Sequence, residues 1–378
     1  MSASSATVAS IAKLRAWKLA LAGPALYWYF PVFYVLLATQ PQVDPVGLTA
    51  LFVVLMLSAS WGFLLNDLAD READSKSGRA DALHGHALSS GAMWALILST
   101  AALSWVVVFL IGGGYAFKVV LAVDYVVATM YSVRPLKLKV RRFWGFLANS
   151  VMERPLPILV LLAYMNYYTA LTVVFPVLME LTWSVFKHQT ADIKEDIEAN
   201  VMTFAASLGE RLSNRIVKEI LNPLSVVSLL SLVTLAWLSV PGLRLILAIA
   251  FILTTIGVSV AFVQERRRRV TFYVTPTDPP YIIALNVSYR YVILVAMAYG
   301  IVTLRADYYP LTVLLAVTLA YQAYAYVGIV KETFRRSGSE PTRPSPRPAG
   351  QPELAQEGAL PGSGVPERAT TGPASTPS

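Results

Sequence analysis

The chain alternates between long apolar runs and short polar or basic stretches as far as about Val330. Most runs approach the roughly 20 residues that an α-helix needs to cross a bilayer. A soluble domain would interrupt such runs with polar faces. The pattern therefore predicts an all-α polytopic membrane protein with ten apolar segments that could be transmembrane helices. The expected spans are residues 17 to 39, 46 to 65, 91 to 111, 115 to 131, 143 to 164, 167 to 186, 222 to 240, 243 to 264, 283 to 304 and 309 to 330.

Composition also indicates lipid as the solvent. Of the 378 residues, 56% are hydrophobic and 14% are charged, whereas soluble proteins carry roughly a quarter charged residues. The chain has no cysteine, which excludes disulfides, thiolate catalysis and Cys-ligated zinc or iron–sulfur clusters. The net charge of +8 does not indicate nucleic-acid binding, because the basic residues fall in short loops between apolar runs.

The basic residues lie in alternate loops, and this sets an orientation. With the N-terminus inside, the loops after every second span are basic, whereas the opposite loops carry chiefly Arg244 and Arg305. Cytoplasmic loops of membrane proteins carry such an excess of Lys and Arg. We therefore predict a multi-pass integral membrane protein whose polar motifs, described below, all lie on the cytoplasmic side.

The ends of the chain differ from its centre. Residues 1–16 are small and weakly basic, and we interpret them as an N-terminal cytoplasmic segment before an uncleaved first span. Residues 17–332 form the expected transmembrane domain. Residues 333–378 are rich in Pro, Gly and Ser without apolar periodicity, so they are expected to be a disordered cytoplasmic tail.

A first acidic cluster ends the second span. Asn66, Asp70 and Asp74 recur every four residues and would line one helix face, with Asp67 near the same stripe. Like charges at this spacing repel each other, and the repulsion grows in a low-dielectric cavity. A bound cation is expected to offset it.

A second acidic cluster, Asp192 and Asp196, follows the sixth span at the same spacing. Two acidic helix ends on one membrane face predict a shared pocket. Carboxylate oxygens suit Mg²⁺, which typically takes one or two carboxylates together with phosphate oxygens of a substrate. The implied ligand is a diphosphate, and a solvated loop is the alternative for either cluster taken alone.

A basic stretch ends the fourth span. Pro135 follows Tyr131 and Ser132 and stops the helix, and the cations there are Arg134, Lys137 and Lys139. These side chains could hold phosphate oxygens. An ordinary positive-inside anchor is the alternative.

Further candidates lie within the spans. Asp124 is ionisable and about two turns before Tyr131, which makes it a functional-site hypothesis, either as a proton acceptor or in orienting an acceptor, unless it pairs with a neighbouring helix. Asn149 is a candidate to face the cavity, and His188 could line the pocket one turn before Asp192. Glu153 and Arg154 are expected to neutralise each other.

These motifs resemble the UbiA superfamily of intramembrane prenyltransferases. Its N-D-x-x-D-x-x-x-D motif is matched from Asn66 to Asp74, and its D-x-x-x-D motif is matched by Asp192 and Asp196. The family's Tyr-Ser-x-x-Pro-x-x-x-Lys stretch is matched from Tyr131 to Lys139. The chain departs from many relatives after the first motif, where residues 78 to 91 do not read Arg-Pro-Leu/Ile-Pro-Ser-Gly.

The resemblance implies a helical bundle, commonly of nine spans, around a central cavity open to the cytoplasmic side. The tenth segment is a departure from that pattern, so we expect about nine or ten transmembrane helices. It also implies a catalytic Mg²⁺ site and diphosphate contacts from Arg134 and Lys139. Together with the candidates named above, the predicted substrate-binding set, for diphosphate or cavity, is Asn66, Tyr131, Arg134, Lys137, Lys139, Asp124 and Asn149. The implied metal ligands are Asn66, Asp67, Asp70, Asp74, Asp192 and Asp196.

The predicted reaction is Mg²⁺-dependent transfer of a prenyl group from its diphosphate to a membrane-resident aromatic or lipid acceptor. The expected partners are these substrates and the bilayer, with no nucleic acid and no obligate protein partner. Three alternatives stay open: a UbiA-type terpene cyclase, phosphoribosyl transfer to a polyprenyl phosphate, and a transporter whose Asp residues bind ions.

Overall fold

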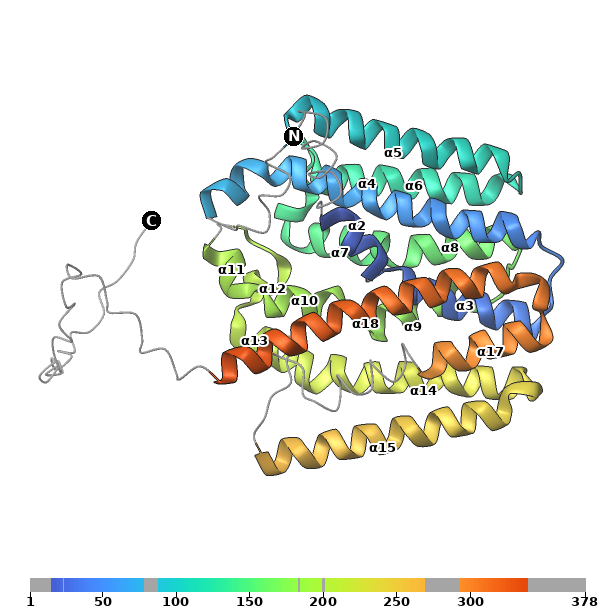
Figure 1. Cartoon of the computed structure of the whole chain (residues 1–378). Coiled ribbons are helices and arrows are strands. Elements are labelled where there is room, and N and C mark those ends of the chain that lie inside the picture. The colour runs from blue at the N-terminus through green and yellow to red at the C-terminus, as the bar shows by residue number, and fades with distance from the viewer. Residues whose placement is uncertain are drawn as a thin grey trace, which may run out of the picture. The chain divides into compact units, whose positions relative to one another are not determined.

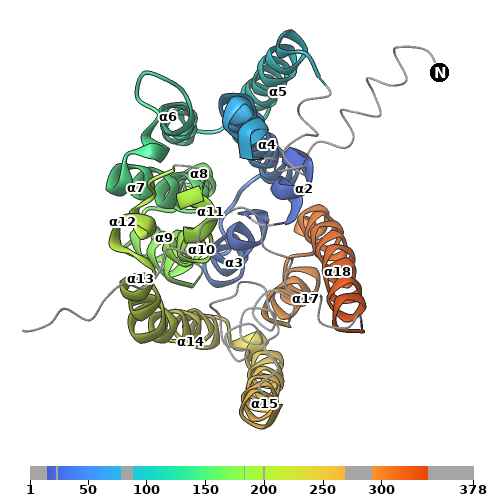
Figure 2. The same ribbon diagram turned by 90° about the vertical axis from the view of Figure 1, so that its left-hand side faces the viewer.

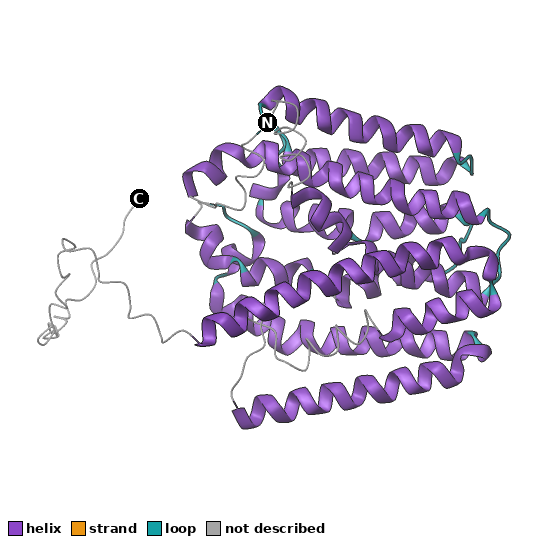
Figure 3. Cartoon of the chain, in the orientation of Figure 1, coloured by secondary structure: helices purple, strands orange, loops and turns teal. Residues whose placement is uncertain are grey.

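The structure is a computed structural model that describes residues 15–22, 24–77, 88–182, 184–198, 201–268 and 292–338. Within these ranges the chain is helical and forms no β-strand (Figure 3). Its contacts divide it into two units, Met1–Val327 and Gly328–Ser378. The described part of the second unit is the helical stretch from 328 to 338, and the following paragraphs concern the first unit.

The first group of helices leads from the N-terminus to the fourth expected span. Asp44 accepts hydrogen bonds from the N–H groups of Val46 and Gly47 at the start of α4, and Ser89 accepts one from Ala92 at the start of α5. Such side-chain caps satisfy N–H groups that lack a partner within the helix. The helices are α2 (Arg15–Ala22), α3 (Pro24–Ala38), α4 (Pro45–Ser77), α5 (Ser90–Leu110) and α6 (Tyr115–Ser132).

The middle group contains shorter helices. Figure 1 shows α10 to α13 gathered at one end of the long helices. Ser184 caps α10 and Thr203 caps α12, so polar residues set where these short helices begin. The helices are α7 (Arg142–Glu153), α8 (Pro155–Tyr164), α9 (Leu171–Thr182), α10 (Val185–Ala191), α11 (Ile193–Glu198), α12 (Phe204–Leu208) and α13 (Glu210–Ile216).

Four further helices complete the unit. They are α14 (Asn222–Ser239), α15 (Arg244–Arg268), α17 (Leu294–Leu304) and α18 (Tyr309–Gly338), of which α18 continues past the end of the first unit. Figure 2, seen along the helices, shows α3 surrounded by α4, α8, α9, α14 and α17. The aromatic side chains of α3 fill this position, since Trp28, Phe30 and Phe33 are fully buried.

Six helical stretches of the described chain are long and apolar enough to cross a membrane. Two shorter apolar helices, Tyr27–Ala38 and Leu294–Leu304, lie among the expected spans. Burial separates inner from outer helices. In the apolar 18-residue stretch of Pro45–Arg71, 61% of the residues are buried, whereas in that of Ser90–Leu110 28% are buried. The inner stretch carries the first acidic motif, whereas α5 presents most of its apolar surface outward.

Two expected spans are interrupted in the structure. The first is divided between α2 and α3, and the fifth is divided at Arg154, between α7 and α8. A proline begins the second piece in each case, namely Pro24 and Pro155, and proline fits the first turn of a helix because the N–H it lacks has no partner there. The sixth span is shorter than expected, with α9 ending at Thr182. The start of the ninth lies outside the described residues, and the count of ten stays a prediction.

Candidate functional site

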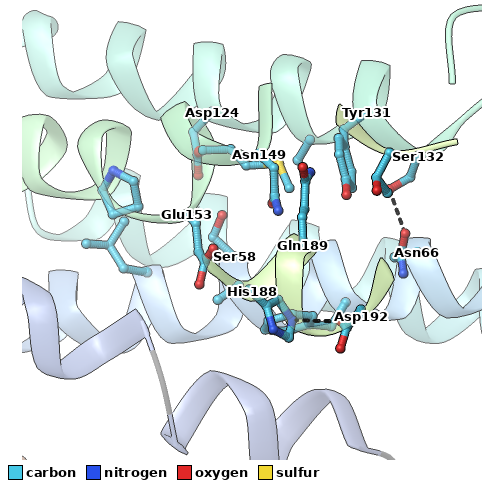
Figure 4. Close-up of a pocket in the computed structure, with 18 of the residues that line it drawn as sticks. Ser58, Asn66, Asp124, Tyr131, Ser132, Asn149, Glu153, His188, Gln189 and Asp192 are labelled. Atoms are coloured by element: carbon cyan, nitrogen blue, oxygen red, sulfur yellow. Dashed lines mark hydrogen bonds and ion pairs between the residues drawn. The ribbon is translucent and has the colours of Figure 1, made fainter. Parts of the chain in front are cut away.

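A cavity of about 360 Å³ opens between α3, α4, α6, α7, α8 and the α10–α11 segment. Figure 4 shows polar side chains from several of these helices pointing into it. The lining residues are Trp28, Leu55, Ser58, Ala59, Gly62, Phe63, Asn66, Asp124, Ala128, Tyr131, Ser132, Asn149, Met152, Glu153, Pro157, His188, Gln189, Asp192, Asp196 and Thr203.

Two helices contribute their residues at helical spacing. On α4 the lining residues recur every three or four positions from Leu55 to Asn66, and on α6 they recur in the same way from Asp124 to Ser132. Residues at this spacing share one face of a helix. The cavity therefore follows one face of each helix over several turns.

The first acidic motif meets the basic stretch at one end of this cavity. The Asn66 amide oxygen accepts hydrogen bonds from Lys139 Nζ at 2.9 Å and from Ser132 Oγ at 3.4 Å. Asp70, one turn further along α4, forms an ion pair with Lys139. Its other oxygen lies 3.6 Å from Lys137 Nζ. The cations predicted to hold phosphate are thus placed beside the carboxylates predicted to hold metal.

A close backbone approach fixes the position of Lys139. Residues Leu138–Val140 form one turn of 3-10 helix against α7. A Cβ atom on Gly145 would lie 2.5 Å from the Leu138 carbonyl oxygen and 2.9 Å from Lys139 Cα. Only glycine leaves room for this contact, so Gly145 lets the turn that carries Lys139 lie directly on α7.

The second acidic motif lies at the junction of α10 and α11. The Asp196 N–H donates to the Asp192 carbonyl at 2.8 Å, which places the two residues one turn apart as their spacing predicts. The Thr203 hydroxyl donates to Asp196 Oδ2 at 3.0 Å and accepts from the Ala206 N–H at 3.3 Å. His188 Nε2 lies 3.7 Å from Asp192 Oδ2 (Figure 4). Thr203 thus links the metal-motif carboxylate to the start of α12.

The structure brings six of the predicted site residues onto one cavity: Asn66, Asp124, Tyr131, Asn149, Asp192 and Asp196. Asp67, Asp70, Arg134, Lys137 and Lys139 are not among the lining residues. Of these, Asp70, Lys137 and Lys139 form the ion-pair cluster described above, and Arg134 is exposed. Asp74 continues α4, and its side chain lies outside the described residues.

The oxygen ligands are divided between two helix ends. Within the described ranges, no three His, Asp or Glu side chains lie close enough together to hold a metal ion by themselves. Asn66 on α4 and the pair Asp192 and Asp196 nevertheless line one cavity. Amide and carboxylate oxygens that leave room between them suit Mg²⁺, which keeps open positions for water and substrate phosphates. They do not resemble a closed site of four protein ligands.

The opposite side of the cavity is also polar. Asp124 is only 7% exposed, and its Oδ1 has no hydrogen-bond partner. Ser58 is its hydrogen-bonding neighbour, and Figure 4 shows Asp124, Ser58 and Glu153 on the side away from Asn66 and Ser132. The Trp28 Nε1 atom is buried without a partner as well. These atoms leave hydrogen-bonding capacity unused deep in the cavity.

Sequence reasoning missed several lining residues. Ser58 lies on the Asn66 face of α4 and could have been found by extending the helical spacing toward the N-terminus. Trp28 and Gln189 gave no such signal. Arg154 was expected to neutralise Glu153, and it does so at 3.0 Å, but it also contacts Glu180 at 2.5 Å. That second contact joins two helices and cannot be read from local spacing.

Comparison with known proteins identifies the class. The sequence matches the model of the UbiA prenyltransferase family over residues 25–274. The chain therefore belongs to this family, and together with its apolar helices this makes it an integral membrane protein. No curated protein matches the sequence.

Two solved structures resemble the fold, both of a UbiA homolog from Archaeoglobus fulgidus. The structure bound to DMAPP and Mg²⁺ is 15% identical, with a TM-score of 0.50, and the match covers 82% of this chain and 99% of that one. The structure bound to GPP and Mg²⁺ is 16% identical, with a TM-score of 0.52, and the match covers 78% of this chain and 99% of that one. At these identities the likeness concerns the fold alone.

Proposed function

We propose that this protein transfers a prenyl group from its diphosphate to an aromatic or lipid acceptor in the membrane, in a Mg²⁺-dependent reaction that releases diphosphate. The observation that supports this proposal most directly is that Asn66 of the first motif lines the same cavity as Asp192 and Asp196 of the second. Family membership supports the reaction type. The Archaeoglobus relatives, which were solved with Mg²⁺ and prenyl diphosphates, support the choice of ligands.

The chain's own residues divide the work in this proposal. Asn66, Asp67, Asp70, Asp74, Asp192 and Asp196 would hold the metal. Mg²⁺, when bound, offsets the negative charge on the leaving diphosphate. Lys137 and Lys139 stand beside Asp70 and add positive charge where the diphosphate would lie.

The middle of the cavity suits an allylic group. Ala59, Gly62, Phe63, Ala128 and Met152 line it between the two polar sides. Apolar walls exclude water, and water would otherwise capture the allylic cation to give an alcohol. Tyr131 lines the same space, and an aromatic face stabilises a nearby cation.

The site is proposed to open to the cytoplasm. Lys137, Lys139, Arg141 and Arg142 cluster at the end of the long helices that carries the acidic motifs. The opposite loops carry Arg244 and Arg305. There the Arg305 guanidinium group donates hydrogen bonds to the carbonyl groups of Leu36 and Pro41. The excess of basic residues on the motif side follows the positive-inside rule.

The proposal is tested with purified protein in detergent and lipid, using prenyl diphosphates labelled in the prenyl chain. Diphosphate release should require Mg²⁺ and stop on chelation with EDTA. Asp192→Ala should lower the release at least a hundredfold, whereas Asp307→Ala, a carboxylate in the loop at the opposite end, should not change it. Wild-type protein that releases no diphosphate from any chain length would reject the proposal. A cyclic hydrocarbon formed without an acceptor would identify a cyclase instead.

A further inference from the structure

The cavity has polar groups at two levels along α4 and α6. Ser132 on α6 hydrogen-bonds Asn66 on α4, so these two residues lie at one level. Asp124 and Ser58, which are hydrogen-bonding neighbours, form a second level on the same two helices. Ser58 precedes Asn66 by eight residues, and Asp124 precedes Ser132 by eight residues. At 1.5 Å per residue the two levels are about 12 Å apart.

The two levels differ in what they offer a ligand. At the Asn66 level the Lys139 ammonium group contacts Asn66, Asp192 and Asp196 line the same cavity, and this is the proposed place of the diphosphate. The Asp124 level lies deeper, and the Oδ1 atom of Asp124 is a buried hydrogen-bond acceptor without a partner. Small and apolar residues, among them Gly62 and Ala128, line the cavity between them.

A prenyl chain alone does not complete the deeper level. A hydrocarbon has no O–H or N–H group, so packing it against Asp124 would leave the buried oxygen unsatisfied. Trp28 also lines the cavity, is 1% exposed and has an indole N–H without a partner. A hydroxyl group donates a hydrogen bond, so a hydroxyl can satisfy the unpaired acceptor Asp124 Oδ1.

We propose that the Asp124 level is the subsite for the acceptor, and that it selects an acceptor carrying a hydroxyl group, which donates a hydrogen bond to Asp124. This inference rests on the proposed prenyl transfer and assigns the second substrate of that reaction. In this arrangement the diphosphate and the acceptor's hydroxyl lie on opposite sides of the apolar middle of the cavity. The acceptor then faces the allylic carbon across the space that Gly62 and Ala128 keep open. Asp124 is then an acceptor-binding residue rather than a metal ligand.

The test separates transfer from capture by water. Purified wild-type and Asp124→Leu proteins are incubated with Mg²⁺, labelled geranyl diphosphate and the total lipid extract of the host membrane as the acceptor source. Leucine has nearly the shape of aspartate and lacks both oxygens, whereas asparagine would keep one hydrogen-bond acceptor. Released diphosphate, prenyl alcohol and prenylated lipid are then measured. For Asp124→Leu we expect the ratio of prenylated lipid to prenyl alcohol to fall at least tenfold. Ser58→Ala should change the ratio in the same direction by a smaller factor.

The control is Thr254→Val. Thr254 is also buried, and its hydroxyl donates a hydrogen bond to the Ala250 carbonyl at 2.8 Å, but it does not line the cavity, so its product ratio should match that of the wild type. An unchanged ratio in Asp124→Leu overturns the inference. Equal losses of diphosphate release and of prenylated product, in an Asp124→Leu protein that elutes normally, also overturn it. If that variant fails to elute as a folded protein, Ser58→Ala decides by the same ratio.

The failure of the underlying function has a different signature. Wild-type protein that releases no diphosphate from prenyl diphosphates of any chain length rejects the proposed function itself. Wild-type protein that releases diphosphate but yields only alcohol or cyclic hydrocarbon rejects the acceptor subsite, and leaves donor ionisation intact. A mass spectrum of the prenylated lipid gives a direct check, because the accepted lipid must contain a hydroxyl group before transfer.

Discussion

The guanidinium group of Arg154 donates a hydrogen bond of 2.5 Å to the carboxylate of Glu180. Arg154 lies at the break between α7 and α8, whereas Glu180 is near the end of α9. The other oxygen of Glu180 accepts from the N–H of Val185 at 2.8 Å, at the first residue of α10. Glu180 therefore ties the broken fifth span to the helix that leads to Asp192.

This contact predicts a large stability effect at Arg154. The residue is 1% exposed and also pairs with Glu153, so Arg154→Met would leave two partly buried carboxylates without their cation. Removing one partner of a buried ion pair costs about 3–5 kcal/mol, and the thermal unfolding temperature in detergent should fall sharply. The unfolding temperature of Glu180→Gln should fall less, because glutamine keeps an oxygen that can accept the hydrogen bond from Val185.

The control for this prediction is Arg215→Ala. Arg215 also pairs with a glutamate, Glu219 at 2.9 Å, but both side chains are exposed. Exposed pairs contribute about 0–1 kcal/mol, so its unfolding temperature should stay near that of the wild type. Equal unfolding temperatures for Arg154→Met and Arg215→Ala would show that the Arg154 contacts do not stabilise the fold.

Lys139 and Lys137 should contribute unequally to donor binding. Lys139 contacts both Asn66 and Asp70, whereas Lys137 lies 3.6 Å from Asp70 and is more exposed, at 22% against 10%. We expect Lys139→Ala to raise the KM for the prenyl diphosphate at least tenfold and Lys137→Ala to raise it by a smaller factor. Lys218→Ala, an exposed cation on a nearby helix, is the charge-matched control. A larger effect at Lys137 would contradict the assignment.

Thr203 should hold the Asp196 carboxylate in the orientation that binds Mg²⁺. Thr203→Val removes the hydroxyl that donates to Asp196 and caps α12, and loss of such a cap costs about 0.5–2 kcal/mol. We expect the Mg²⁺ concentration for half-maximal diphosphate release to rise. Thr203→Ser keeps the hydroxyl and should restore the wild-type value. If Val and Ser variants behave alike, the hydroxyl has no part in metal binding.

The sequence predicted what depends on local spacing and on the bilayer. Apolar runs become helices because an unpaired backbone group in lipid is too costly, and the expectation that Asp192 and Asp196 lie one turn apart follows from the helical period. The sequence also predicted that the two acidic clusters share a pocket, but it did not predict which individual side chains of distant segments touch. Lys139 lies on Asn66 and Asp70 because α4 and α6 pack together, and Glu180 reaches Arg154 because α9 packs on α8. The prolines at 155 and 157 were a local signal for the break at Arg154, and the length of the apolar run concealed it.

A methyl group at Gly145 should disturb the donor site without touching it. In Gly145→Ala the new Cβ would meet backbone atoms of Leu138 and Lys139 at 2.5 and 2.9 Å, and backbone cannot move aside as a flexible side chain can. The turn carrying Lys139 must then shift away from α7, which weakens its contacts with Asn66 and Asp70. We expect a higher KM for the prenyl diphosphate, in the direction of Lys139→Ala. Gly91→Ala is the matched control, because a Cβ there meets nothing within 4 Å, and an unchanged KM in Gly145→Ala would show that the turn does not depend on this close approach.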